Sequence, residues 1–179
     1  MFKIILLVIA AILAVFAIVV ALQPSNFRIA RSIVIDAPPA AIFAQVEDFR
    51  RWTAWSPYEK LDPHLQRSYH GPAAGEGAVY DWVGDQNAGE GRATIVESRP
   101  GERVRIELAF RKPFQATNIA EFAFRPVGDK TEVTWSMSGE RNFMFKAFGL
   151  VMNMDKIAGA QFEDGLKQLK AIAESQPRP

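Results

Sequence analysis

An apolar run near the N-terminal end constrains the folding of this chain more than any other feature. From Ile4 to Leu22 the sequence contains no charged residue, no glycine and no proline. As an α-helix rising ~1.5 Å per residue, this run would be roughly 28 Å long, close to the hydrocarbon thickness of a bilayer. The residues after Gln23 have the mixed composition of a soluble domain. We therefore expect a transmembrane anchor over residues 1–22, a linker over 23–26 and a globular domain over 27–179.

A cleaved signal peptide is the alternative interpretation of this run. The apolar region of a signal peptide usually spans ~7–15 residues and ends in a small-x-small cleavage site. This run is longer, and Ala21-Leu22-Gln23-Pro24 offers no such site, so we favour an uncleaved single-pass anchor. Lys3 on one side nearly balances Arg28 and Arg31 on the other, so the positive-inside rule leaves the orientation open. The short segment before Lys3 slightly favours a domain outside the cytoplasm.

The composition of the rest of the chain limits its partners. All 20 acidic residues and all but one of the 21 basic residues lie beyond the apolar run, so the formal net charge of the domain is zero. We expect no nucleic-acid partner, because such a partner normally requires a basic face. The chain has no cysteine and only two histidines, His64 and His70, so we expect neither a disulfide nor a metal site. We also expect no cofactor.

Apolar periodicities predict an α+β domain. Residues 27–35 alternate as a strand with a slip near Ala30, and Asp36 followed by two prolines predicts a helix start, with helical segments over 40–49 and 50–55. Six further alternating segments between residues 65 and 138 are separated by turn residues, which predicts antiparallel neighbours. Apolar residues at helical spacing predict a long helix over 152–174. This helix would cover a curved antiparallel sheet of about seven strands.

Six motifs along the domain carry a resemblance to a known superfamily. They are Ile33-x-Ile35-x-Ala37-Pro38, Trp52-x-x-Trp55-Ser56-Pro57, Gly71-Pro72-x-x-Gly75-x-Gly77-Ala78, Phe110-x-Lys112-Pro113-Phe114, Val133-Thr134-Trp135-x-Met137-x-Gly139, and Met154-Asp155-Lys156 leading to Phe162-Glu163-x-Gly165-Leu166. The chain resembles the START-like superfamily (the SRPBCC group), which includes polyketide cyclases, dehydrases and lipid-transport proteins. The resemblance spans nearly all of residues 27–179 and implies a helix-grip fold. It leaves the function open, because the superfamily contains binders, carriers and a minority of enzymes.

A helix that closes over a curved sheet leaves a cavity unless large side chains fill it. Small residues on the long helix, Ala158, Gly159 and Gly165, favour such a cavity, as do aromatic residues with polar tips on the facing strands. The alternative is that the glycines permit close helix–sheet contact and the aromatic residues form an ordinary core. The residues that we predict to bind a ligand there are Tyr80, Trp82, Asn118, Trp135, Asp155, Ala158 and Phe162.

Two of these residues are polar candidates with simpler alternative roles. Asn118 shares a strand face with Ala120 and Phe122, so its amide points inward, where it pairs with backbone near Pro113 or orients an oxygen of a ligand. Asp155 lies near the start of the long helix. There it either interacts favourably with the helix N-terminus or contributes to catalysis.

These features predict a membrane-anchored protein that binds a hydrophobic small molecule or lipid in an internal cavity. One alternative is an enzyme resembling polyketide cyclases or dehydratases, with Tyr80, Asn118 or Asp155 as acid–base or hydrogen-bonding groups. A second alternative is a module with a filled core that binds a protein partner. We expect the glycine-rich segment 71–77 to form a loop at the mouth of the cavity. A dry cavity would favour binding, and convergent titratable groups would favour catalysis.

Overall fold

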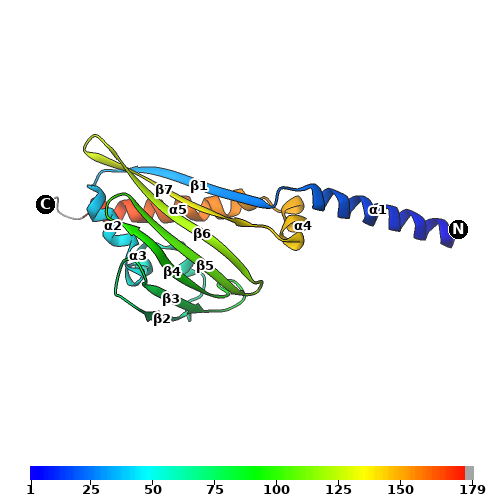
Figure 1. Ribbon diagram of the computed structural model, residues 1–179, viewed down its shortest axis with the longest axis horizontal. Helices are drawn as coiled ribbons and strands as arrows, with labels where there is room; N and C mark the ends of the chain where they lie inside the picture. Colours follow the sequence, from blue (N-terminus) through cyan, green and yellow to red (C-terminus); the bar gives the residue numbers. More distant parts are fainter. Residues whose placement is uncertain (176–179) are drawn as a thin grey trace.

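The computed structural model describes residues 1–175 and consists of one isolated apolar helix joined to an α+β domain (Figure 1). Helix α1 (Phe2–Leu22) is the one helix in this part of the chain that is long and apolar enough to cross a membrane, and a signal sequence would meet the same criteria. The end of the predicted domain, residues 176–179, lies outside the described residues. The elements that follow α1 are β1 (Asn26–Ile35), α2 (Pro39–Val46), the 3-10 helix η1 (Phe49–Arg51), α3 (Trp52–Trp55), the 3-10 helix η2 (Pro57–Lys60), β2 (Gln66–His70), β3 (Val79–Val83), β4 (Glu90–Arg99), β5 (Arg103–Lys112), β6 (Ala116–Val127), β7 (Lys130–Glu140), α4 (Phe143–Val151) and α5 (Met154–Glu174).

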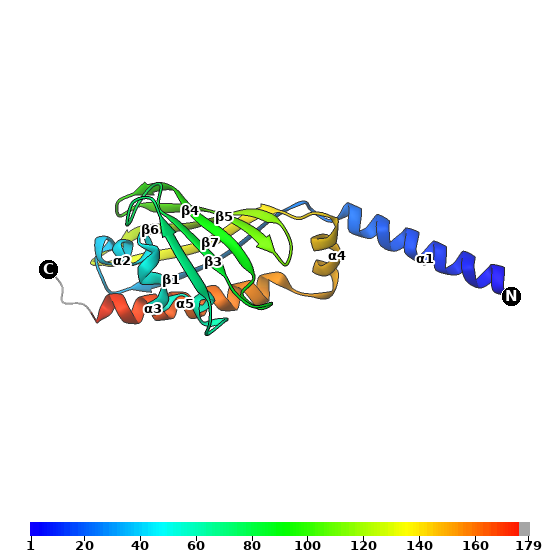
Figure 2. The same cartoon turned by 90° about the horizontal axis from the view of Figure 1, so that it is seen from below.

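The predicted α+β helix-grip fold is confirmed. Seven antiparallel strands form one sheet in the order β1-β7-β6-β5-β4-β3-β2. Each strand from β2 to β6 therefore pairs with the next one along the chain. Strand β1 closes the order by pairing with β7. The sheet curves, and α5 runs along it, which both views show (Figures 1 and 2). The space between α5 and the sheet is therefore where the core and any internal site must lie.

A stack of aromatic rings fills the centre of this space. The ring of Trp135 on β7 lies between Phe122 of β6 and Phe162 of α5, with centroid distances of 4.8 and 4.4 Å. Trp55 of α3 is fully buried and meets Trp135 edge-on at 5.7 Å. The indole N–H of Trp55 donates to the carbonyl of Gln45. Trp55 thus packs α3 against the core and links it to α2.

The two glycines of α5 make room for side chains from the sheet. A Cβ at Gly159 would lie 2.0 Å from Nη2 of Arg31, and a Cβ at Gly165 would lie 2.6 Å from Cζ3 of Trp135. The alternative interpretation of these glycines, close helix–sheet contact, is therefore the correct one. Strand β1 also has no slip, because Arg31 continues its inward-facing row and reaches α5.

Helix α4 was not predicted, and the long helix starts at Met154 rather than at residue 152. Asparagine side chains begin both helices. Oδ1 of Asn142 accepts from the amide of Phe145 at 2.9 Å, and Oδ1 of Asn153 accepts from the amide of Lys156 at 3.0 Å. Asparagine is a preferred N-cap residue, so these two positions are the signal that the sequence analysis missed.

The helical segments after β1 also differ in detail from the prediction. Pro38, not Asp36, precedes the first residue of α2, and α2 ends at Val46. The predicted segment 50–55 divides into η1 and α3, and η2 follows at Pro57. Ser56, between α3 and η2, and Tyr58 and Glu59 of η2 lie next to residues of the sheet.

Candidate functional site

Two neighbouring cavities lie between the sheet and the helices. The first, here called the core cavity, has a volume of about 180 Å³ and is lined by residues of α3, η2, β3 to β7 and α5. The second, here called the α4 cavity, has a volume of about 790 Å³ and lies between α4, the start of α5 and the adjoining ends of β1, β6 and β7. Met137 of β7 lines both cavities. The two spaces therefore share a wall.

The core cavity brings together four of the residues predicted to bind a ligand, Tyr80, Trp82, Trp135 and Phe162. Its other walls are mostly apolar, with Leu108, Phe110 and Ala120 among them. The indole N–H of Trp82 donates to the carbonyl of Ala88 at 3.1 Å, which fixes that ring at the edge of the cavity.

A buried carboxylate provides the main polar group of the core cavity. Oε1 of Glu59 accepts from the hydroxyl of Tyr80 at 2.6 Å, and Oε2 accepts from Nε of Arg67 at 2.6 Å. The side chain of Glu59 is only 4% exposed. Burial, followed by the hydrogen bond to Glu59, raises the pKa of Tyr80 well above its ordinary value. The hydroxyl of Tyr80 therefore stays protonated at neutral pH and donates a hydrogen bond to Glu59.

Two further polar atoms of residues lining the core cavity are buried without a hydrogen-bond partner among the described residues. They are Nε1 of Trp135 and Oγ of Ser56. A buried donor without a partner costs about 1–3 kcal/mol. An oxygen of a bound molecule could remove that cost.

The α4 cavity is lined by the remaining three predicted residues, Asn118, Asp155 and Ala158. One prediction was that Asn118 pairs with backbone near Pro113. Its side chain makes no such hydrogen bond within residues 1–175. Its Oδ1 is buried with no partner in the described part of the chain, and its Nδ2 lies 3.9 Å from Sδ of Met137. The amide oxygen of Asn118 packs against Gly139, where a Cβ would lie 2.1 Å from it, so a bound molecule reaches this oxygen only if the side chain of Asn118 turns.

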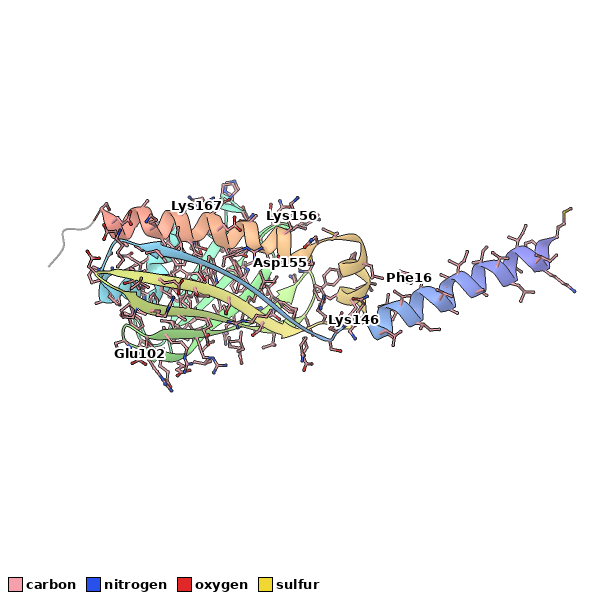
Figure 3. The ribbon with its side chains drawn as sticks, turned by 90° about the horizontal axis from the view of Figure 1, so that it is seen from above. Phe16, Glu102, Lys146, Asp155, Lys156 and Lys167 are labelled. Carbon is pink, nitrogen blue, oxygen red and sulfur yellow. The ribbon has the colours of Figure 1, made fainter. Side chains whose placement is uncertain are left out.

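Asp155 lies in the first turn of α5, where one prediction placed it in a favourable interaction with the helix N-terminus, and it also forms an ion pair with Arg31. Nη2 of Arg31 donates to its carboxylate at 3.0 Å, and Nε of Arg31 reaches Glu163 at 2.9 Å. The hydrogen bond from Arg31 lowers the pKa of Asp155 below its ordinary value. The side chain is 61% exposed, at the start of α5 as Figure 3 shows. Asp155 thus joins β1 to α5 at the rim of the cavity.

Several lining residues were not predicted from the sequence. Glu59, Ser56 and Met137 had no assigned role, and Arg67 was not considered as a partner of Glu59. Burial of Glu59 depends on how η2 folds under the sheet, which no local periodicity reveals. The glycine-rich segment 71–77, expected at the mouth of a cavity, lines neither cavity and instead contacts Glu47 and Arg50. Among residues 1–175, no group of three or more His, Asp and Glu side chains is placed to hold a metal ion.

Comparison with solved structures shows the same fold in proteins of low sequence identity. Protein CV1439 from Chromobacterium violaceum is 18% identical, with a TM-score of 0.60, and the match covers 86% of this chain and 100% of that protein. The Aha1 dimer from Colwellia psychrerythraea is 16% identical, with a TM-score of 0.60, covering 83% of this chain and 97% of that one.

A di-domain protein gives a comparable structural match. StfQ, described as an ARO/CYC protein of the steffimycin biosynthetic pathway, is 12% identical with a TM-score of 0.62. The match covers 84% of this chain and 51% of StfQ, so this chain corresponds to about half of that protein. No match was found among curated proteins. A family model described as polyketide cyclase / dehydrase and lipid transport matches residues 26–174. The chain therefore belongs to the polyketide cyclase / dehydrase and lipid transport family.

Proposed function

We propose that this protein binds an amphipathic, lipid-like molecule while α1 holds the domain at a membrane. The apolar part of the molecule would occupy the core cavity, and its polar part would occupy the α4 cavity. The observation that carries this proposal is the pairing of two cavities of different character across Met137. The core cavity is lined mainly by apolar and aromatic side chains. The α4 cavity adds several polar and charged residues, namely Asn26, Arg28, Asn118, Glu140, Arg141, Asn153 and Asp155.

The volumes support a ligand that uses both spaces. Sites for small organic molecules usually measure ~300–1,000 Å³. The α4 cavity, at about 790 Å³, lies in this range, whereas the core cavity, at about 180 Å³, holds only part of such a molecule. Methionine has an unbranched side chain that changes rotamer readily. Rotation of Met137 would join the two cavities.

The membrane anchor and the family support the same class of ligand. Helix α1 has 21 residues and a length of about 31 Å, enough to span the hydrocarbon core of a bilayer. The family description includes lipid transport. A protein held at a bilayer has direct access to amphipathic molecules.

A catalytic role is the second candidate function, and the Glu59–Tyr80 pair is the observation that favours it. The carboxylate of Glu59 and the hydroxyl of Tyr80 meet at the core cavity, and Arg67, which does not line the cavity, pairs with Glu59. StfQ, described as an ARO/CYC protein, has a similar fold. However, Asn118 and Asp155 line the other cavity. A cyclase or dehydratase mechanism would therefore depend on Tyr80 and Glu59 alone among the groups considered.

Photo-cross-linking of the full chain in phosphatidylcholine nanodiscs tests the binding proposal. The probe is a fatty acid with a diazirine near the end of its acyl chain. We expect cross-links on peptides of β7 and α5 that line the core cavity, around Met137 and Phe162. Cross-links confined to α1 and α4 would overturn the proposal, because they would show that the probe only surrounds the anchor.

Replacement of Ala158 by Leu provides a matched test of the α4 cavity. Ala158 lines this cavity, so a larger side chain fills open space and leaves the stability near that of the native chain, whereas overpacking a filled site costs ~1–3 kcal/mol. We expect Ala158→Leu to reduce cross-linking of β7 and α5 several-fold. The control is Ala160→Leu, because Ala160 is exposed on the same helix and lines neither cavity. Equal cross-linking in both variants would contradict a ligand path through the α4 cavity.

A further inference from the structure

Helix α4 carries an exposed apolar face that the fold of the domain does not use. Phe143, Met144 and Phe148 are 55%, 54% and 43% exposed. Neighbouring positions extend this apolar surface beyond the helix. They are Phe114 in the loop between β5 and β6, Leu150 at the end of α4, Met152, and Met154 and Ile157 at the start of α5. Together these eight residues are here called the α4 surface.

An adjoining side of α4, about 100° round the helix axis from Met144 and Phe148, faces the protein. Phe145 and Gly149, four residues apart on the helix, line the α4 cavity. The ring of Phe145 also packs edge-on against Phe114 at 5.8 Å. Met144 and Phe148 are likewise four residues apart, so they share the exposed side. Leu150, Met152 and Met154 of the α4 surface also line the α4 cavity, so this surface lies at the rim of the cavity.

The position of α4 relative to α1 identifies what covers that face. Helix α4 lies crosswise at the end of α1, between α1 and the sheet (Figures 1 and 2). The two helices are in contact, and Val20 of α1 is fully buried, whereas the other residues of α1 are exposed. Val20 precedes the last residue of α1 by about 3 Å along the helix axis. If α1 spans a bilayer, α4 lies at the level where α1 leaves the hydrocarbon and runs along the membrane surface.

The residues of α4 suit a helix lying in the lipid–water interface. Such helices bury an apolar face about 5–10 Å into the boundary between headgroups and acyl chains, with basic residues on the polar side. Lys146 is the only charged residue of α4, and it lies next to the end of α1 (Figure 3). Arg141 precedes the helix. The sequence of α4 therefore offers no acidic group that an anionic membrane surface would repel.

We propose that the α4 surface inserts into the bilayer that holds α1, so that the α4 cavity opens at the lipid surface and receives its ligand from the membrane. This inference rests on the proposed membrane anchor and adds the route by which the ligand enters. A ligand drawn from the bilayer passes α4 without crossing water. Gly149 has no side chain and lines the cavity, and a Cβ placed there would lie 3.7 Å from Nη1 of Arg141.

Site-directed spin labelling of the full chain in nanodiscs tests this proposal. The chain contains no cysteine, so a single cysteine can be labelled at each chosen position. Met144→Cys and Phe148→Cys probe the α4 surface. Val96→Cys and Val127→Cys are matched aqueous controls, because both residues are exposed to a similar degree, at 42%. Ile12→Cys reports separately on the anchor. The measurement is the relative collision of the label with oxygen, which concentrates in lipid, and with a water-soluble nickel chelate.

We expect the ratio of oxygen to nickel accessibility at residues 144 and 148 to be several-fold higher than at residues 96 and 127. A lipid-like ratio at residue 12 with aqueous ratios at 144 and 148 would overturn the inference while leaving the anchor intact. An aqueous ratio at residue 12 would overturn the anchor itself. Low collision with both reagents at 144 and 148, with dipolar broadening between labels, would instead show that a second copy of the chain covers α4. That result would also overturn the proposal.

Discussion

At the scale of single residues, Glu59 is the most informative side chain of the domain. Its carboxylate is buried and accepts hydrogen bonds from both Tyr80 and Arg67. Burial of a charge is costly unless it is paired and hydrogen-bonded, and removal of one partner leaves an unsatisfied group. The pair therefore has a structural consequence whether or not it takes part in catalysis.

Replacement of Tyr80 by Phe separates these roles. The change removes the donor to Oε1 of Glu59, so we expect a loss of about 1–3 kcal/mol in the free energy of unfolding. If the protein is a binding protein, cross-linking of the diazirine fatty acid by the folded variant stays close to that of the native chain. Tyr58→Phe is the control, because the hydroxyl of Tyr58 makes no side-chain hydrogen bond within residues 1–175. Chemical denaturation measures the difference, and equal stability of the two variants would argue against the Glu59 interaction.

The ion pairs of Asp81 on β3 are expected to make the stability of the domain depend on pH in the acid range. Its carboxylate lies 3.0 Å from Nη2 of Arg92 and 3.3 Å from Nη2 of Arg111, and its side chain is 13% exposed. The hydrogen bond from Arg92 lowers the pKa of Asp81 below the ordinary value of 3.8. A lowered carboxyl pKa stabilises the fold above the unfolded pKa, and this stabilisation disappears as the pH falls through the folded pKa.

We therefore expect Asp81 to contribute to stability at neutral pH and to lose this contribution below about pH 4. In Asp81→Asn, the melting temperature should be lower than that of the native chain at pH 7, and the gap should narrow as the pH falls below about 4. Asp164→Asn, which removes an exposed carboxylate on α5, should show little gap at either pH. A constant gap for Asp81→Asn across this range would contradict the predicted linkage.

At the scale of elements, the packing of α5 depends on two glycines that contact different kinds of atoms. A Cβ at Gly165 would meet the Trp135 ring at 2.6 Å and Cδ of Pro57 at 2.9 Å. Both of these groups are held within the core. A Cβ at Gly159 would meet the guanidinium of Arg31, which ends a flexible side chain. The same substitution should therefore have different consequences at these two positions, about 1.7 turns apart on one helix.

We expect Gly165→Ala to destabilise the domain by about 1–3 kcal/mol, because overpacking displaces the aromatic stack. This cost exceeds the gain of about 1 kcal/mol that alanine brings to a helix interior. Gly159→Ala should be milder, because the flexible side chain of Arg31 can move away and its ion pairs with Asp155 and Glu163 are screened by solvent. Thermal denaturation of both variants measures the order, and a larger loss for Gly159→Ala would show that the Arg31 contacts dominate.

At the scale of the whole molecule, helix α1 is not part of the hydrophobic core of the domain. The buried apolar cluster of the domain extends from Ile29 to Ala173 and includes no residue of α1. Helix α1 contacts α4 and otherwise extends away from the domain (Figure 1). The stability of the domain should therefore depend little on the anchor.

A variant that lacks residues 1–23 tests this separation. We expect it to fold with a melting temperature close to that of the full chain and to bind phospholipid vesicles through the α4 surface. Replacement of Met144 and Phe148 by Ser in this variant should abolish vesicle binding without changing the melting temperature. A truncated domain that remains unfolded would show that α1 contributes to the core.

Local sequence patterns were sufficient for the parts of the fold that depend on neighbours along the chain. The apolar run of α1, the alternation of β5 and the helical spacing of Phe162, Leu166 and Leu169 all report the environment of a single element. Each periodicity indicates which side chains are buried, because burial repeats with the geometry of the helix or strand. These patterns therefore predicted the antiparallel pairing of consecutive strands from β2 to β7 and the long helix that covers the sheet, but not the pairing of β1 with β7.

The site depended on tertiary structure, because its groups come from elements far apart in the sequence. Burial of Glu59 requires η2 to fold under β3, and the place of Arg31 requires β1 to pass Gly159 of α5. The sequence analysis predicted one cavity, whereas the curvature of the sheet and the position of α4 divided the predicted residues between two. The residue types alone determined an apolar N-terminal helix and an aromatic core. The register of the strands and the packing of the helices decided which polar atoms face each other, since no local periodicity encodes contacts between distant segments.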